Sequence, residues 1–543
     1  MSTPRFYLLG FGALMLFDTL TQVSLKLVST HTGEFAMTLE WFRHIVDSAW
    51  ILGAILGYLG AFATWMTLLK HAPIGPAFAA AHLEVVPVLV ISAAAPLTAV
   101  AGGVPISMLL GNGAGIAGSF LIVTVILLLF SVGYVAMARH VTNAGAFYAF
   151  TAQGLGGRMG GAAAMVAILS YNAMQIGILG LLGAASAGTF GALGVNLPWW
   201  GWSLIAVAIV AVLGYRQVDL SAKILMVLVA LEYLIVLIVI VAIFLKGGDS
   251  GLSLAPFSWG QITSGTPAIG ILFCFAAFIG FEAMTIYSEE AREPKISVPR
   301  ATYASVLLIG VFYTITAWLM AVGEGVDKLL PTLQGLKDPT TFLFDLAGRY
   351  AGGTVATIMG FLFISSLFAA VLAFHNGVAR YKYVAGREGL LPDSIGVTHP
   401  VHQSPHVGSV IQTIIAVLVV GLFAVLGLDP VLALFTWLTQ LGTLGVLGLM
   451  AATSFSVIAY FSANGGLGEN ALSTKVLPLI AGVIMSGLFV YIFVQFGALV
   501  GASTVLGIVL PSLVIVAALI GFALASGLAG RDPGRFARLG QAR

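Results

Sequence analysis

The sequence contains little charge and almost no cysteine. Of its 543 residues only 8% are Asp, Glu, Lys or Arg and 59% are hydrophobic, whereas a soluble globular protein carries about 25% charged residues. This composition excludes a soluble enzyme of this size. A net charge of +2 without a basic stripe excludes a nucleic-acid-binding protein. The single cysteine, Cys274, excludes a disulfide framework and a cysteine-ligated metal site.

Long apolar runs take the place of the missing charge. A helix needs about 20 mostly apolar residues to cross a bilayer, whereas a membrane barrel shows alternating segments of about 10 residues. The runs in this chain are long and continuous, so we expect an all-α polytopic membrane protein with about 14 spans. The expected spans are 6–28, 48–70, 85–110, 116–138, 158–187, 196–215, 218–246, 263–287, 299–322, 352–384, 407–427, 430–461, 475–496 and 504–528.

Lys and Arg residues gather on one side of these spans. With the N-terminus placed inside, 17 of the 23 basic residues fall on the cytoplasmic side, where membrane proteins concentrate them. We therefore predict a multi-pass protein of the inner (cytoplasmic) membrane with both termini in the cytoplasm. The sequence has no nucleophile–base constellation and no cofactor motif, so we expect neither an enzymatic activity nor a bound cofactor or metal.

Two of the predicted spans carry matched interruptions. The third span contains Ala-Gly-Gly-Val-Pro at 101–105, where two glycines would release the backbone and the proline suits the start of a new helix. The eighth contains Gly280 beside Glu282. The interruptions lie five spans apart in the chain, which is the spacing of a five-plus-five inverted repeat with its substrate at the midplane. Glycines that only permit close helix packing are the alternative.

Two opened helices would suit a zwitterion. The amides at the start of a half-helix favour an anion such as a carboxylate, and the carbonyls at the end of a half-helix favour a cation such as an ammonium. The interruptions therefore predict a site for an amino acid or a related amine.

Around these interruptions the chain resembles the amino acid–polyamine–organocation family of permeases. The matching stretches are APLTAVAGGVP at 95–105, GNGAG at 111–115, RHVTNAGAFYAFTAQGLG at 139–156, FIGFEAMTIYSEEAREPKISVPRA at 278–301 and HNGVARYKYVAGREGLLP at 375–392. The resemblance covers about 85–530 and implies a leucine-transporter-type fold with twelve helices. Its inverted repeats would span about 85–246 and 263–461, followed by a basic cytoplasmic tail at 531–543.

The resemblance also implies where substrate binds. The first break would hold a carboxylate and the second would present carbonyls to an amine, with Gly280 as its hinge. Ala276 stands where some relatives have a gating tryptophan, which disfavours a stacked guanidinium and admits a larger or apolar side chain. For the polar and aromatic candidates on other helices, interhelical bonding or core packing is the alternative. The predicted substrate contacts are Gly102, Gly103, Val104, Tyr171, Asn172, Gln175, Phe275, Ala276, Phe278, Gly280 and Phe374.

Four polar residues are candidates for coupling or gating. Carboxylates at membrane depth are costly and usually face the bundle interior, which singles out Glu282 after the second break and Glu232 in the most apolar span. Ser365 and Ser366 in the tenth span offer hydroxyl oxygens to a hard cation. The alternative for Glu282 is a structural carboxylate hydrogen-bonded to freed backbone amides, and the alternative for Glu232 is a carboxylate that a neighbouring helix satisfies.

Histidines near the predicted cytoplasmic ends have simpler interpretations. His375 is expected to help hold an inner gate rather than to bind substrate. Three further histidines are spaced by three and four residues, as in some metal sites, but prolines interrupt any helix there. We therefore expect loop residues at His399, His402 and His406.

The first 84 residues depart from the permease pattern. They carry two extra predicted spans, and Asp18 followed eight residues later by Lys26 weakly resembles a fragment of a small multidrug-resistance or drug/metabolite transporter. The fourth helix of such a transporter is missing, so we expect a fused relic or an accessory hairpin rather than an independent efflux unit.

Together these features predict a secondary active transporter of amino acids or related amines that works by alternating access, with proton-coupled import. Its expected partners are the small substrate, a proton or Na⁺, and the lipid bilayer, with no nucleic acid. An obligate antiporter or a sodium-coupled symporter stays open. From a different class, so does a non-transporting sensor built on a permease scaffold.

Overall fold

The computed structural model describes residues 95–541 except 142–144, 217–221, 250, 283–293 and 502, and also Ser24. The two predicted N-terminal spans, with Asp18 and Lys26, lie outside the described residues. The total of 14 spans and the domain boundary after residue 84 therefore stay predictions.

Within the described part of the chain, ten helices are long and apolar enough to cross a membrane, and each corresponds to a predicted span. These residues contain no strand, and the fold is of the leucine-transporter type. The helices are α6 (Ile116–Ala138), α8 (Gly157–Gly191), α9 (Trp199–Arg216), α10 (Ala222–Lys246), α14 (Pro294–Glu324), α17 (Gly353–Arg387), α18 (His406–Val425), α19 (Thr436–Ala463), α20 (Leu477–Gln495) and α21 (Thr504–Arg531).

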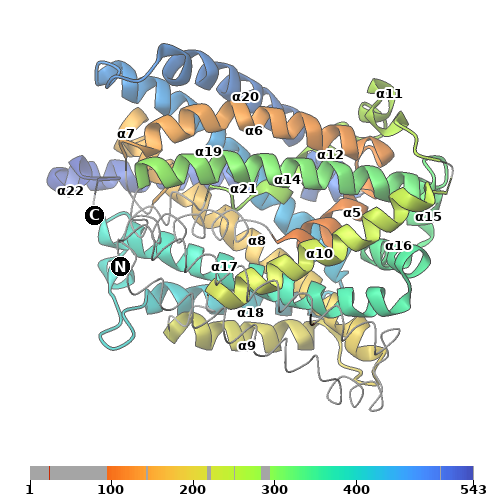
Figure 1. The fold of residues 1–543 in the computed structure, drawn as a ribbon. Helices are drawn as coiled ribbons and strands as arrows, with labels where there is room; N and C mark the ends of the chain where they lie inside the picture. The colour runs from red at the N-terminus through yellow and green to blue at the C-terminus, as the bar shows by residue number, and fades with distance from the viewer. Residues whose placement is uncertain are drawn as a thin grey trace, which may run out of the picture. The chain divides into compact units, whose positions relative to one another are not determined.

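Shorter elements connect or extend these helices. Helices α6 and α14 pack against each other along their lengths (Figure 1). The π-helical turns η6 and η7 lead directly into α19 and α20. The shorter elements are η1 (Thr98–Gly103), α5 (Val104–Leu110), η2 (Gly113–Gly115), α7 (Phe147–Leu155), η3 (Ala255–Phe257), α11 (Trp259–Ile262), α12 (Pro267–Phe278), α15 (Leu329–Gly335), η4 (Pro339–Thr341), α16 (Phe342–Ala351), η5 (Asp393–Gly396), η6 (Pro430–Phe435), η7 (Leu472–Val476), η8 (Phe496–Leu499) and α22 (Pro533–Ala537).

Helix α8 is the most deeply packed of the long helices. It contacts α7, α17, α19 and α21, and 89% of its apolar stretch is buried. Small residues make these contacts close: a Cβ added at Gly161 would lie 2.5 Å from the carbonyl oxygen of Gly521 in α21. Glycine at such positions lets two membrane helices approach backbone to backbone.

The first predicted interruption is not an open break. Gly103 (φ −78°, ψ −46°) and Val104 (φ −61°, ψ −48°) are helical, and the chain passes from the π-helical turn η1 directly into α5. The Val104 N–H donates to the Ala99 carbonyl, so the wider turn keeps its amides paired. A Cβ at Gly102 would lie 2.6 Å from the Leu181 side chain. The expectation that the paired glycines release the backbone is therefore wrong, because Gly102 serves close packing on α8.

The second predicted interruption is present. Helix α12 ends at Phe278, Ile279 is extended (φ −60°, ψ 128°), and Gly280 has φ 121°. Side chains other than hydrogen rarely tolerate such a backbone, so the glycine is required where the helix stops. The two short apolar helices, Thr98–Leu110 and Pro267–Phe278, are thus interrupted in different ways.

We predict opposite effects from two glycine replacements in α8. Gly161→Ala forces a methyl group against α21 and should destabilise the protein by about 1–3 kcal/mol, the usual cost of overpacking. Gly188→Ala has nothing within 4 Å of the added Cβ and should be neutral or stabilising, since alanine favours helix by up to about 1 kcal/mol. Thermal unfolding of the purified protein in detergent measures both. Equal melting temperatures for the two variants would contradict the packing assigned to Gly161.

Candidate substrate and coupling site

A cavity lies between the two short apolar helices. About 80 Å³ of it is open to the centre of a water molecule, several times the space that one ordered water needs. Its walls come from η1 and α5, from α12, and from α6, α8, α17 and the η6–α19 segment. Within the part of the chain that the structure describes, no Asp, Glu, Lys or Arg lines this space.

The structure brings four of the eleven predicted substrate contacts to the cavity wall: Gly103, Val104, Ala276 and Phe374. The roles of all eleven as contacts stay predictions. The seven outside the lining are Gly102, Tyr171, Asn172, Gln175, Phe275, Phe278 and Gly280.

The three polar candidates on α8 use their polar atoms inside the bundle. The Tyr171 hydroxyl donates to Glu282 Oε1 at 2.7 Å. The Asn172 amide donates to the carbonyl of Ile168, one turn back, at 2.7 Å. Gln175 bonds to residues of α17 and α18, away from the cavity. Tyr171 and Gln175 fit the interhelical alternative considered for them, whereas Asn172 bonds within α8 and its buried Oδ1 has no partner among the described residues.

The polar atoms that face the cavity are mainly acceptors. Ser107 donates its proton to the Val104 carbonyl at 2.6 Å, and Thr439 donates its proton to the Phe435 carbonyl at 2.7 Å. Both hydroxyl oxygens can then only accept a further bond. A bound group with N–H donors, such as an ammonium, fits such a wall.

Gln440 is a cavity residue that the sequence analysis missed. Its Nε2 donates to Thr439 Oγ1 at 3.4 Å. Because the Thr439 hydroxyl proton already bonds to the Phe435 carbonyl, the nitrogen of the Gln440 amide, and not its oxygen, must face Thr439. The Gln440 Oε1 is buried and has no partner among the described residues. A glutamine within the apolar stretch at 436–447 was a readable signal, since polar side chains at membrane depth are seldom without a role.

The end of α12 adds further acceptors beside Ala276. The N–H groups of Ile279 and Phe281 turn back to the carbonyls of Ala276 and Phe278, each at 3.2 Å, instead of continuing the α-helical pattern. The last carbonyls of a helix lack intrahelical partners, and the helix dipole places partial negative charge there. Ala276, Ala277 and Ile279 all line the cavity, so this end of the helix suits a cation.

Glu282 fastens the second interruption. Its Oε2 accepts from the Gly280 N–H at 2.8 Å and its Oε1 from the Tyr171 hydroxyl at 2.7 Å. Its carbonyl accepts from Tyr134 of α6 at 3.1 Å. The carboxylate is buried and lies outside the cavity lining, where it links the broken segment to α8.

Glu232 and Ser366 meet at the start of the other short helix. The Leu97 N–H donates to Glu232 Oε2 and the Thr98 N–H donates to Ser366 Oγ, both at 3.3 Å. The hydroxyls of Thr98 and Ser366 lie 3.0 Å apart. The first amides of a helix have no intrahelical acceptor and attract negative charge. The fourth predicted coupling residue, Ser365, bonds to the Leu362 carbonyl of its own helix.

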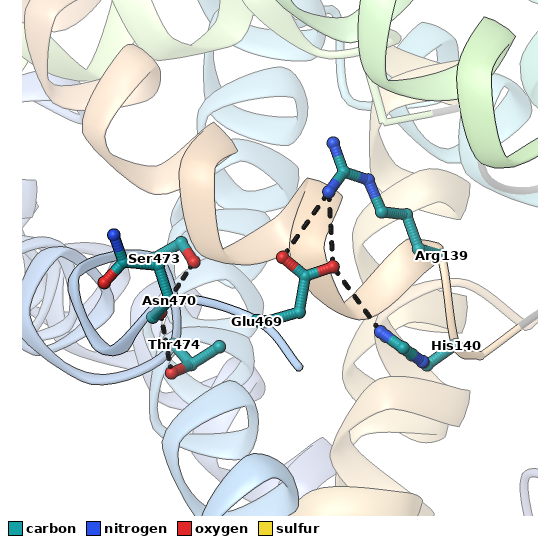
Figure 2. Close-up of polar contacts among 6 residues, drawn as sticks. All are labelled: Arg139, His140, Glu469, Asn470, Ser473 and Thr474. Atoms are coloured by element: carbon teal, nitrogen blue, oxygen red, sulfur yellow. Dashed lines mark hydrogen bonds and ion pairs between the residues drawn. The ribbon is translucent and has the colours of Figure 1, made fainter. Parts of the chain in front are cut away.

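One end of the bundle is held by an ion pair. Arg139 and His140, which follow α6, both reach Glu469 ahead of η7, at 3.2 Å and 3.5 Å (Figure 2). Beside Glu469, the Asn470 carbonyl accepts from Ser473 and Thr474 and so shapes the turn (Figure 2). The Arg139 side chain is 42% exposed, and exposed ion pairs add little stability. This contact therefore contributes mainly to position.

The three spaced histidines come together around Tyr215, with ring centroids 5.3, 6.2 and 5.9 Å from the tyrosine. His399 and His402 lie in a loop as expected, but His406 is the first residue of α18, so its assignment to the loop is wrong. Partial burial and the neighbouring histidines lower the pKa of His399. Among the described residues, no group of three His, Cys, Asp or Glu side chains has the arrangement of a metal site.

A helical membrane bundle with a cavity between two interrupted helices is the architecture of a secondary transporter. The chain belongs to the amino acid permease family, whose profile matches residues 87–524. This match confirms the resemblance to the amino acid–polyamine–organocation permeases.

Two bacterial relatives illustrate the range of cargo in this family. The low-affinity putrescine importer PlaP of Escherichia coli is 24% identical over 341 residues, which is 61% of this chain and 70% of that protein. The branched-chain amino acid permease BcaP of Bacillus subtilis is 26% identical over 336 residues, 56% of this chain and 68% of that protein.

Solved structures share the fold. A manganese transporter from Eremococcus coleocola, in complex with an aromatic bis-isothiourea compound, superposes with a TM-score of 0.53 at 17% identity. The match covers 86% of this chain and 97% of that transporter. At this level of identity the likeness concerns the fold and not the cargo.

Proposed function

We propose that this protein is a secondary active transporter that imports an amino acid or a related amine with a neutral side chain, driven by protons. The observation that carries the proposal is the cavity between the two interrupted helices, whose wall offers hydrogen-bond acceptors and, among the described residues, no charged side chain. The protein would lie in the inner membrane of the cell. The basic end of the bundle, near Arg139, would face the cytoplasm.

The substrate ammonium would bind at the end of α12. There the carbonyls near Ala276 and the helix dipole favour positive charge, and Ser107, Thr439 and Gln440 offer oxygen acceptors nearby. The substrate carboxylate is expected near Gly103 and Val104. Their amides are paired within the helix, so this contact requires the π-helical turn to open when substrate binds.

The remaining wall favours a neutral side chain. It is formed by apolar groups, among them Phe120, Met174, Ile178 and Phe374. A second ammonium would be buried there without a counter-ion, and burying an unpaired charge is costly. The wall therefore suits the branched-chain cargo of the Bacillus relative better than the putrescine of the Escherichia coli relative.

Glu232 would couple this site to the proton gradient. It accepts from the Leu97 N–H at the start of η1, and protonation would remove the negative charge that attracts this helix end. Substrate and proton would then act on the same element, η1 with α5. The oxygens of Thr98, Ser366 and Glu232 together also form a set that Na⁺ prefers, so sodium is the competing driver.

Uptake into proteoliposomes tests this function. We expect accumulation of a labelled neutral amino acid when the outside is acidic, and less accumulation of putrescine or arginine. Glu232→Gln keeps an oxygen for the Leu97 N–H but cannot titrate. It should therefore abolish proton-driven accumulation while preserving exchange of labelled for unlabelled substrate.

The control for this variant is Asp393→Asn, whose side chain is 72% exposed and pairs with Arg535. Accumulation driven by a sodium gradient would show that sodium, and not protons, drives transport. Exchange without accumulation under any gradient would indicate an obligate antiporter. Binding of the panel without either process would indicate a sensor. Glu232→Gln with the pH and sodium dependence of the wild type would contradict coupling through Glu232.

We predict that Gln440 selects for neutral cargo. Gln440→Glu places a carboxylate on the cavity wall and should raise the uptake of putrescine relative to the neutral amino acid by about tenfold, as a charge-assisted hydrogen bond of about 1.5–3 kcal/mol allows. Gln440→Leu removes the acceptor and should lower uptake of both. The control is Gln495→Glu, at an exposed position near the end of α20. An unchanged substrate ratio in Gln440→Glu would contradict this role.

A further inference from the structure

A chain of buried polar side chains lies behind the cavity wall. Gln175 of α8 and His375 of α17 each directly follow a cavity-lining residue, Met174 and Phe374. Lys382 lies two turns beyond His375 on the same helix, and its residue is 4% exposed. Lys382 is one of the 17 basic residues expected on the cytoplasmic side, but the structure buries it in the bundle.

Four hydrogen bonds join these residues in series. Lys382 Nζ donates to Gln412 Oε1 of α18 at 2.7 Å, and Gln412 Nε2 donates to Gln175 Oε1. Gln175 Nε2 lies 3.2 Å from His375 Nδ1, and His375 Nε2 lies 2.7 Å from the Ser409 hydroxyl of α18. Every member of the series is buried.

The charge on Lys382 sets the direction of the whole series. An ammonium has donors and no acceptor, so it must face the oxygen of Gln412, which turns the Gln412 amide nitrogen toward the oxygen of Gln175. The Gln175 amide nitrogen then faces His375 Nδ1, which has to accept. With Lys382 charged, His375 is therefore neutral and carries its proton on Nε2, where it donates to Ser409.

A proton on both ends of the series is disfavoured by geometry as well as by charge. A doubly protonated His375 would donate from Nδ1 and would force the Gln175 and Gln412 amides to turn over. The Gln412 amide nitrogen would then face the ammonium of Lys382, donor against donor. The turned arrangement is satisfied only when Lys382 has lost its proton and its neutral amine accepts from Gln412.

We propose that Lys382 and His375 are the two ends of a site that holds one exchangeable proton. The proton is bound at one end or the other, according to the orientation of the paired amides of Gln412 and Gln175. One proton leaves Lys382 and one binds His375 Nδ1, so the net charge of the series stays +1, and the amides turn without carrying the proton themselves. The protons exchange with water. Ser409 borders a groove of about 440 Å³ between α9 and α18, so the surface lies close to the Nε2 side of His375.

Close packing holds the His375 end in place. A Cβ added at Gly214 of α9 would lie 2.6 Å from His375 Nε2 and 3.0 Å from Ser409 Oγ. The glycine therefore lets α9 approach the ring, and the ring has little room to rotate. A change in the proton position must then be accommodated by a reorientation of the Gln175 and Gln412 amides, which lie between α8, α17 and α18.

Other titratable groups do not take part in the series. None of them lies within hydrogen-bond or ion-pair distance of Lys382 or His375 among the residues that the structure describes. On α17 and the elements packed against it, the other described titratable side chains are Arg158, Tyr171, Tyr215, Arg216, Glu232, Tyr233, Lys246, Asp345, Arg349, Tyr350, Arg380, Tyr381, Tyr383, Arg387, Glu388, Asp393, His399, His402 and His406.

The test is the tautomer of His375 in the purified full-length protein, read from the nitrogen NMR shifts of ¹⁵N-histidine-labelled samples in lipid nanodiscs. Comparison with His375→Asn identifies its signals among the nine histidines. We expect the neutral form with the proton on Nε2 at neutral pH. Lys382→Met removes the obligatory donor, so the amides can turn and both tautomers of His375 should appear. Lys382→Arg keeps a donor and should retain the wild-type signal.

Gln412→Glu gives a second route should Lys382→Met not fold. Its carboxylate pairs with Lys382 and can only accept, so the Gln175 amide nitrogen must turn toward it and the Gln175 oxygen toward His375. The direction beyond residue 412 is then reversed, and His375 should carry its proton on Nδ1. A wild-type His375 with its proton on Nδ1, or identical tautomers in wild type, Lys382→Met and Gln412→Glu, would overturn the proposal. This readout needs no transport, so its failure is distinct from a failure of the proposed function.

Discussion

A polypeptide inside a bilayer must satisfy every backbone polar group internally, and this constraint governs the whole site. The two short apolar helices expose amides and carbonyls where they begin or stop. Two buried carboxylates take amides at these points: Glu232 accepts from Leu97, and Glu282 accepts from Gly280. These two helix ends are therefore fixed by buried carboxylates, one on another helix and one just beyond the end of α12, and the cavity between the helices takes its shape from those contacts.

The polarity of the cavity follows from the same requirement that buried polar groups be paired. Once Ser107 and Thr439 donate to backbone carbonyls, their oxygens can only accept, and Gln440 presents an oxygen because its nitrogen bonds to Thr439. Each hydrogen bond within the wall fixes what the wall offers to a substrate. A space beside the end of α12 that offers acceptors and, among the described residues, no charged side chain suits an ammonium attached to a neutral side chain. The same reasoning about donors sets the direction of the series from Lys382 to His375.

The sequence predicted the long helices because membrane depth demands continuous apolar runs, and it predicted the second break because a helix stop at positive φ requires Gly280. It failed at the first break. Gly102 packs against Leu181 of α8, a tertiary contact that a local glycine pattern cannot distinguish from a released backbone. The meeting of Glu232 with Leu97, and of Gln175 with His375 and Gln412, joins residues far apart in the chain. Their polar identities were legible in the sequence, but their partners depend on how the helices pack.

Amide hydrogen exchange at the start of η1 and just after α12 tests most directly that buried carboxylates hold these two helix ends. The account predicts slow exchange at Leu97 and at Gly280 in the substrate-free protein. In Glu232→Ala, exchange at Leu97 should accelerate while exchange at Gly280 stays slow, because Glu282 still holds that amide. Fast exchange at Leu97 in the wild type, or an unchanged rate there in Glu232→Ala, would contradict the account.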